Sequence, residues 1–160
     1  MAIPHFEIER KFLLRSDAWR AQVRSSIPMQ QGYLNDEQHC SVRVRIAGED
    51  AWLNLKGVTI GAQRLEFEYA IPLADARRML SELACKPLIT KTRHLVEVGA
   101  HTWEIDVFEG ANAGLVVAEI ELGDPDEAFE KPDWVGDEVT YDPRYYNTRL
   151  ASNPYRLWPA

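Results

Sequence analysis

Residues 5–14 read HFEIERKFLL, with charged and apolar residues alternating through their middle. This alternation predicts a β-strand. Residues two apart in a strand share a face, so Glu7, Glu9 and Lys11 are expected to point the same way. Neighbouring like charges repel each other and gain from a counter-ion. The segment therefore predicts a strand with one charged face.

The same alternation recurs in six further segments. The grouped positions are Arg43 with Arg45, Asn54 with Lys56, Arg64 with Glu66 and Glu68, Lys91 with Arg93, Glu104 with Asp106, and Glu119 with Glu121. For any single strand the alternative is a sheet with its charged face in water, since charged residues are mostly exposed. Because charged groups recur in this way across seven strands, and in six of them as same-sign pairs, the pattern favours a shared face for divalent cations and a polyphosphate.

Eight segments are predicted as strands, at 5–14, 29–34, 40–47, 51–56, 63–71, 88–98, 102–108 and 115–122. Helices are predicted at 16–24, 74–84, 124–131 and 142–151. This order predicts a mainly β, α+β fold: an eight-stranded antiparallel closed barrel or tunnel with a charged interior and flanking helices. Residues 1–160 are expected to form a single domain, because no repeat or Gly/Ser-rich linker divides them.

Composition narrows the possible partners. The net charge of −7 argues against nucleic acid or an anionic membrane as the main partner, although not against a small polyanion. No apolar run approaches the ~20 residues of a membrane span, and Glu7 and Glu9 stand where a signal peptide would be apolar. A cytoplasmic protein is expected.

Cys40 and Cys85 are predicted to be two buried thiols rather than a disulfide or a zinc site.

The charged segments together resemble the CYTH, or triphosphate tunnel metalloenzyme, family. Glu7-Ile8-Glu9-Arg10-Lys11 is similar to the Glu-x-Glu-x-Lys signature that opens these proteins. The further matches, in order, are Val-Arg-Val-Arg at 42–45, Leu-Lys at 55–56, Arg-x-Glu-x-Glu at 64–68, Lys-Thr-Arg at 91–93 and Glu-x-Glu at 119–121. The tail at 138–147 also looks like the end of short bacterial members, so the resemblance covers nearly the full length.

The resemblance implies a role for each charged group. The implied metal ligands, for Mg²⁺ or Mn²⁺, are Glu7, Glu9, Asp106, Glu119 and Glu121. The implied substrate-binding residues are Lys11, Arg43, Arg45, Lys56, Arg64, Lys91 and Arg93. Lys91, Lys56 and Tyr33 are the implied catalytic residues, while Glu66, Glu68 and Asp106 could instead keep the basic groups in place. These roles agree with the preference of hard cations for carboxylates and of phosphates for guanidinium groups.

The implied activity is metal-dependent hydrolysis of tripolyphosphate to pyrophosphate and phosphate. Two other activities in the same tunnel stay open, adenylate cyclase and thiamine triphosphatase, the latter because Tyr33 and Lys56 match a Tyr–Lys pair of such enzymes. A non-catalytic sensor of polyphosphate or nucleotides is the alternative from another class. The partner is a small-molecule triphosphate in each case, and a homodimer also stays open.

Overall fold

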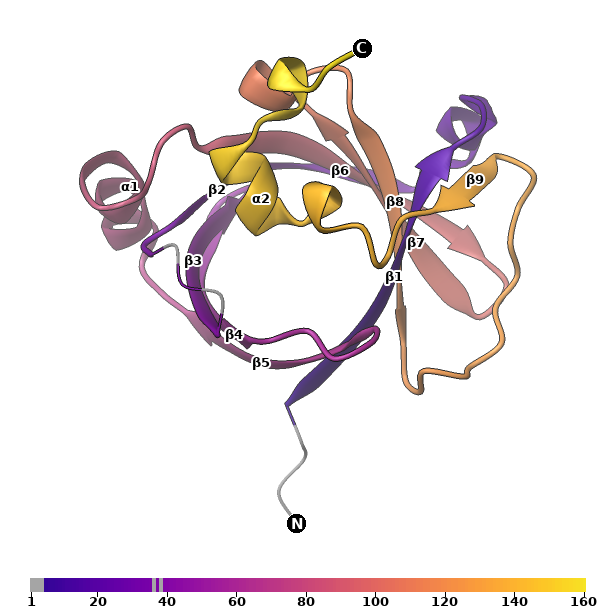
Figure 1. Cartoon of the computed structure of the whole chain (residues 1–160), viewed down its shortest axis with the longest axis horizontal. Helices are drawn as coiled ribbons and strands as arrows, with labels where there is room; N and C mark the ends of the chain where they lie inside the picture. The colour runs from indigo at the N-terminus through magenta and orange to yellow at the C-terminus, as the bar shows by residue number, and fades with distance from the viewer. Residues whose placement is uncertain (1–4, 36, 38) are drawn as a thin grey trace.

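The computed structural model describes residues 5–35, 37 and 39–160. Within them, strands form one nine-stranded sheet, most of which curls into a ring (Figure 1). The strands are β1 (Phe6–Leu14), β2 (Ser25–Tyr33), β3 (Cys40–Ala47), β4 (Asp50–Gly57), β5 (Gln63–Ala70), β6 (Ile89–Val98), β7 (His101–Phe108), β8 (Val116–Leu122) and β9 (Val135–Glu138). The helical segments are η1 (Ala18–Gln22), α1 (Leu73–Glu82), η2 (Gly110–Asn112), η3 (Pro143–Tyr145), α2 (Asn147–Ser152) and η4 (Tyr155–Leu157).

β1 closes the ring because it pairs along both of its edges. The strand order is β5-β4-β3-β2-β6-β7-β8-β1-β9, with an additional antiparallel pairing between β5 and β1. Glu7 pairs with Arg64 on β5, and Glu9 pairs with Glu121 on β8. Closure removes the unpaired edges that an open sheet would expose. The predicted eight-stranded antiparallel barrel is confirmed, and β9 is an extra strand outside the ring.

β9 was not predicted, and it uses the part of β1 that β5 leaves free. Leu14 of β1 pairs with Val135 of β9. A four-residue strand carries too little alternation to be predicted from sequence.

The predicted helix at 124–131 is wrong, because this segment is irregular and packs Phe129 on Trp103, with ring centroids 5.8 Å apart.

Two other predicted helices are shorter than expected. In place of the helix at 16–24 there is only the 3-10 turn η1. Ser16 lies just before this turn, and its Oγ accepts a hydrogen bond from the Ala18 amide. The helix at 142–151 is divided into η3 and α2. Both cysteines are free, as predicted, but Cys85 is exposed and Cys40 half-buried, so the prediction of two buried thiols is wrong.

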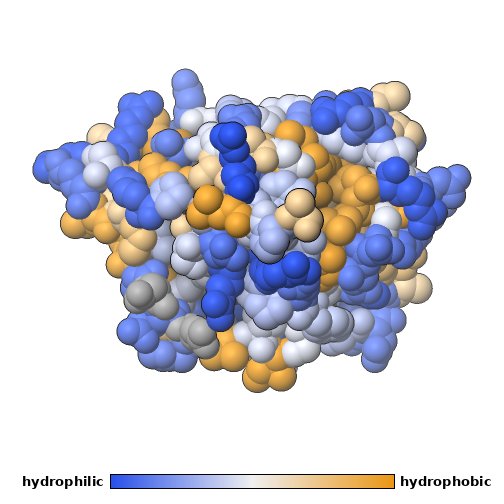
Figure 2. Space-filling view, turned by 45° about the horizontal axis from the view of Figure 1, so that its top comes forward, coloured by the Kyte–Doolittle hydropathy of each residue, from blue (hydrophilic) through white to orange (hydrophobic). Residues whose placement is uncertain are grey.

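Apolar faces of the barrel strands point outward and are covered. One cluster joins the outer faces of β1, β6, β7 and β8 to Trp19 of η1 and to Trp134 beside β9. Another joins β3 and β4 to α1 through Val44 and Leu80. The surface around them mixes hydrophilic and apolar residues (Figure 2). This arrangement leaves most of the inward-facing positions to charged and polar residues.

One end of the barrel interior is apolar. Ile89, Phe108 and Val117 lie on the inward faces of β6, β7 and β8, two residues from Lys91, Asp106 and Glu119 respectively. They pack with Tyr33 and with Leu150 of α2, whose side chain is fully buried. α2 therefore lies across this end of the ring (Figure 1). The C-terminal segment closes the barrel there by burying apolar surface.

Among the described residues, no helix is long and apolar enough to cross a membrane.

Candidate active site

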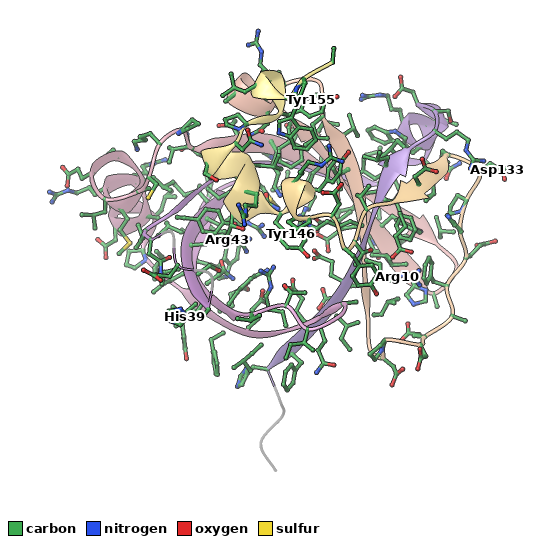
Figure 3. All side chains as sticks on the ribbon, viewed as in Figure 1. Arg10, His39, Arg43, Asp133, Tyr146 and Tyr155 are labelled. Atoms are coloured by element: carbon green, nitrogen blue, oxygen red, sulfur yellow. The ribbon has the colours of Figure 1, made fainter. Side chains whose placement is uncertain are left out.

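A cavity of about 220 Å³ lies in the barrel, and charged side chains dominate its wall. Eleven of the thirteen predicted site residues line it: Glu7, Glu9, Lys11, Tyr33, Arg43, Arg45, Lys56, Arg64, Arg93, Glu119 and Glu121. The other two, Lys91 and Asp106, do not. Figure 3 shows side chains converging on the ring from opposite strands, with Arg43 on one wall and Tyr146 near α2. The strand alternation thus brings together residues that lie more than a hundred positions apart.

The acidic side of the cavity is built on β1 and β8. Burial raises the pKa of Glu9 well above its usual value, and the charges of Glu119 and Glu7 add to this effect. Burial acts in the same direction on Glu119, but Lys11 and Arg93 overcome it and hold its pKa well below the usual range. Glu9 is therefore a carboxyl group whose ionised form is poorly stabilised, and it lies beside Glu119, which is held ionised.

Two lysines lie between these carboxylates. The Nζ of Lys56 donates to Glu7 at 2.9 Å and lies 2.9 Å from Glu66. The Nζ of Lys11 lies 3.5 Å from Glu119 and 3.9 Å from Glu9. Each ammonium group thus occupies a position between two carboxylates that a cation would also favour.

The donor set fits a divalent metal, although the side chains are not gathered around one. Carboxylate oxygens are the ligands that Mg²⁺ and Mn²⁺ prefer. Glu7, Glu9, Glu119 and Glu121 all line the cavity, and the nearby lysines do not offset the rise in the pKa of Glu9. In the part of the chain that the structure describes, however, no three His, Cys, Asp or Glu side chains form a ready-made metal group. Carboxylates that repel one another are expected to turn toward the lysines until a cation draws them together.

The opposite wall carries arginines that face the cavity. Across residues 5–35, 37 and 39–160, no carboxylate oxygen lies within 4 Å of Arg43 or Arg45. Arg43 is only 5% exposed, and its Nε finds no hydrogen-bond partner among the residues that the structure describes. Burial lowers the pKa of Arg45 to about 10, with the charges of Arg43 and Arg93 contributing. Buried guanidinium groups that lack counter-charges form a site for a polyanion.

Arg93 connects this wall to a buried ion pair behind it. Its Nε and Nη2 donate to Asp106 at 2.8 and 2.9 Å, and Lys91 Nζ donates to the same carboxylate at 2.6 Å. Arg93 also forms an ion pair with Glu104. Burial lowers the pKa of Lys91 to about 7, and the charges of Arg93 and Arg45 add to this effect, whereas the charge of Asp106 opposes it. Asp106 stays ionised, since Arg93 and Lys91 overcome the effect of burial and lower its pKa.

Some residues of the cavity were not predicted. Thr140 and Asn147 line it, and Gln31 lies fully buried beside it. Gln31 alternates with Tyr33 on β2, which is a signal that could have found it. Thr140 and Asn147 come from outside the barrel strands, so strand alternation could not place them.

The fold and the cavity together define an antiparallel barrel that encloses both buried arginines and a group of carboxylates. Residues 5–146 match the CYTH domain family. The chain belongs to this family.

Relatives match along almost the whole chain. An inorganic triphosphatase of Acetivibrio thermocellus is 45% identical over 150 residues, covering 94% of this chain and 96% of its own length. An inorganic triphosphatase of Nitrosomonas europaea is 34% identical over 149 residues, covering 91% and 96%.

Solved structures share the fold. The crystal structure of an inorganic triphosphatase superposes with a TM-score of 0.65 at 30% identity, covering 94% of this chain and 95% of that one. A Hippeastrum protein described as a putative adenylyl cyclase with a dominant triphosphatase activity superposes with a TM-score of 0.56. Its identity is 17%, with coverage of 74% and 80%, so it shows the fold alone.

Proposed function

We propose that this protein is a hydrolase that cleaves inorganic tripolyphosphate to pyrophosphate and phosphate, and that it needs a divalent cation. The observation that carries the proposal is the pair Arg43 and Arg45, which line the cavity with no carboxylate oxygen of the described residues within 4 Å, while carboxylates line its other side. A single cavity thus offers a site for a polyanion next to a site for cations. The inorganic triphosphatases that are 45% and 34% identical support the same substrate.

Phosphoryl transfer needs mainly positioning and electrostatic stabilisation from the protein. Arg43 and Arg45 would hold the phosphate chain, since guanidinium groups make paired hydrogen bonds to phosphate oxygens. Arg93 would contact the chain from β6, with its orientation set by Asp106. Lys11, Lys56 and Arg64 also line the cavity and would bind further phosphate oxygens.

Glu7, Glu9, Glu119 and Glu121 would hold the cation, Mg²⁺ or Mn²⁺. When bound, such a cation neutralises phosphate charge and acidifies a coordinated water. Lys11 and Lys56 would then exchange carboxylate partners for phosphate oxygens, because a cation among the glutamates takes over their role of charge compensation.

The predicted roles of Lys91 and Asp106 take a different form in this proposal. Both are fully buried, and Asp106 accepts hydrogen bonds from Lys91 and Arg93. We propose that Asp106 keeps the two basic groups in place. We also propose that Lys91, which does not line the cavity, affects the reaction through its ion pair with Asp106. Tyr33 is packed against Ile89 and Phe108, so packing is proposed for it ahead of catalysis.

Phosphate release tests the proposal and its alternatives. Tripolyphosphate, pyrophosphate, ATP and thiamine triphosphate would each be assayed with Mg²⁺, with Mn²⁺ and with EDTA. Fast release from tripolyphosphate that EDTA abolishes is expected. Conversion of ATP to cyclic AMP and pyrophosphate would select the cyclase, a preference for thiamine triphosphate the thiamine triphosphatase, and tight binding without turnover the sensor.

A cytoplasmic location is part of the proposal. Its support is that Cys40 and Cys85 are both free, as is usual in a reducing compartment.

A further inference from the structure

One oxygen of Asn147 is shared by two donors from the barrel. Asn147 is the first residue of α2, and its Oδ1 accepts a hydrogen bond from Gln31 Nε2 at 3.0 Å. The Nζ of Lys91 donates to the same oxygen at 3.4 Å, a longer and weaker contact. The closing segment is therefore joined to the inward faces of β2 and β6 by a polar side chain as well as by apolar packing.

Gln31 continues the link to the anion-binding wall. It lies opposite Arg45 in the β2–β3 pairing, and its Oε1 accepts from Arg45 Nε at 2.8 Å. An arginine can only donate, so the amide of Gln31 must turn its oxygen toward Arg45 and its NH₂ group toward Asn147. Arg45 therefore donates to Gln31, and Gln31 donates to Asn147. Gln31, in the middle of this series, is fully buried.

This series gives Arg45 a fixed orientation that no carboxylate supplies. Within the described ranges, no carboxylate oxygen lies within 4 Å of its guanidinium group. Its Nε is engaged by Gln31, which leaves the other guanidinium N–H groups to face the cavity that Arg45 lines. Gln31 can keep its own orientation only if its NH₂ group has an acceptor, because a buried amide without one is costly.

We propose that Asn147 is a positioning residue, which through Gln31 holds Arg45 in the orientation that binds the phosphate chain. The inference rests on the proposed function, since it assigns Arg45 to phosphate binding. Leu150 anchors α2 in the apolar end of the barrel, and Asn147 transmits that anchoring to the arginine. The closing segment thus contributes to substrate affinity without supplying a charged ligand.

The direct test is the Kd of tripolyphosphate, measured by calorimetry without metal so that no turnover occurs. Asn147→Leu keeps the size of the side chain and removes its oxygen, and Gln31→Ala breaks the link from the barrel side. Each is expected to raise Kd about tenfold, the loss typical of one hydrogen bond to a charged group. Ser152→Ala, in the exposed last turn of the same helix, is the control and should leave Kd unchanged.

A double-mutant cycle separates positioning from general stability. Asn147→Leu should have no further effect on Kd when Arg45→Ala is already present, and it should add little to Gln31→Ala. The NMR signal of the Arg45 Nε–H group should also move in Asn147→Leu, although that substitution is remote from it. Effects of Asn147→Leu and Arg45→Ala that multiply, or a lower Tm with an unchanged Kd, would overturn the inference.

The two proposals fail in different ways. Wild-type protein that binds tripolyphosphate without hydrolysing it would contradict the proposed activity. The double-mutant cycle on Kd could still be measured in that case, and it would still test the role of Asn147. Wild-type hydrolysis together with an unchanged Kd in Asn147→Leu and Gln31→Ala would contradict only the role of Asn147.

Discussion

Glu9 and Glu121 are directly opposite each other in the β1–β8 pairing, on the inward face of the barrel. Opposed like charges destabilise a sheet by up to about 1 kcal/mol unless a cation lies between them. Arg64 lies opposite Glu7 two residues earlier, and Lys11 lies opposite Glu119 two residues later. The Glu9–Glu121 pair is therefore the part of β1 where the barrel places negative charge against negative charge.

We expect Glu9→Gln and Glu121→Gln each to abolish tripolyphosphate turnover while the fold stays intact, because each removes a charged ligand of the proposed cation. The measurements are kcat with Mg²⁺ and with Mn²⁺, and a circular dichroism spectrum. Glu49→Gln, at the exposed turn between β3 and β4, is the control. Near-normal activity in both variants at saturating metal would remove these residues from the metal site.

The stability gain of Glu9→Gln in metal-free protein should depend on pH. Burial and neighbouring carboxylates raise the folded-state pKa of Glu9 above its usual 4.5. Between those two pKa values the folded state binds the extra proton, so the contribution of Glu9 to stability falls as pH rises. The variant has no such loss, and its advantage in Tm should appear only above about pH 4.5. A Tm difference that is constant from pH 4 to pH 8 would contradict the raised pKa.

Tripolyphosphate should stabilise the folded protein strongly. A ligand that binds only the folded state adds about 2.7 kcal/mol at a hundred times its Kd. In a chain of this size that corresponds to a rise of about 5–11 °C in Tm. Monophosphate should do much less, since it reaches only a few of the basic groups.

Matched arginine variants identify the origin of this stabilisation. Arg43→Ala removes a buried cavity guanidinium and should lose most of the Tm shift, whereas Arg77→Ala, on the exposed face of α1, should retain it. A shift of equal size in both variants would mean that the anion binds elsewhere.

Arg45 and Lys91 should differ in the kinetic constant that they affect. Arg45 lines the cavity, so Arg45→Ala is expected to raise KM and also lower kcat, because the chain is then held less firmly. Lys91 is buried behind the wall and reaches Asp106, so Lys91→Ala should lower kcat by about a hundredfold with little change in KM. Steady-state kinetics with tripolyphosphate check both. A Lys91→Ala enzyme with an unchanged kcat and a raised KM would assign that residue to binding alone.

Much of the barrel and of its charged cavity could be predicted because strand geometry is local. Side chains two apart share a face whatever the rest of the chain does. Runs such as Glu7-x-Glu9 and Arg43-x-Arg45 therefore indicated the inward face before any pairing was known. For the same reason, eleven of the predicted side chains line one cavity.

The position of a residue along the barrel axis could not be predicted from strand alternation. Lys91 and Arg93 alternate identically in the sequence, yet only Arg93 lines the cavity. The difference arises because α2 covers the end of the barrel where Lys91 lies, and Asn147 contacts it there. A contact between residues 56 positions apart leaves no trace in local alternation.

The sequence by itself determined which face of most strands is charged, and with that the class of fold and the basis for proposing a polyanionic ligand. The tertiary structure alone decided which edges of β1 are paired, where the cavity ends and how Arg45 is held. These depend on contacts between distant segments, such as Glu7 with Arg64, Leu150 with Ile89, and Gln31 with Asn147. Local periodicity restricts the direction of a side chain, whereas its partner is chosen only when the chain closes on itself.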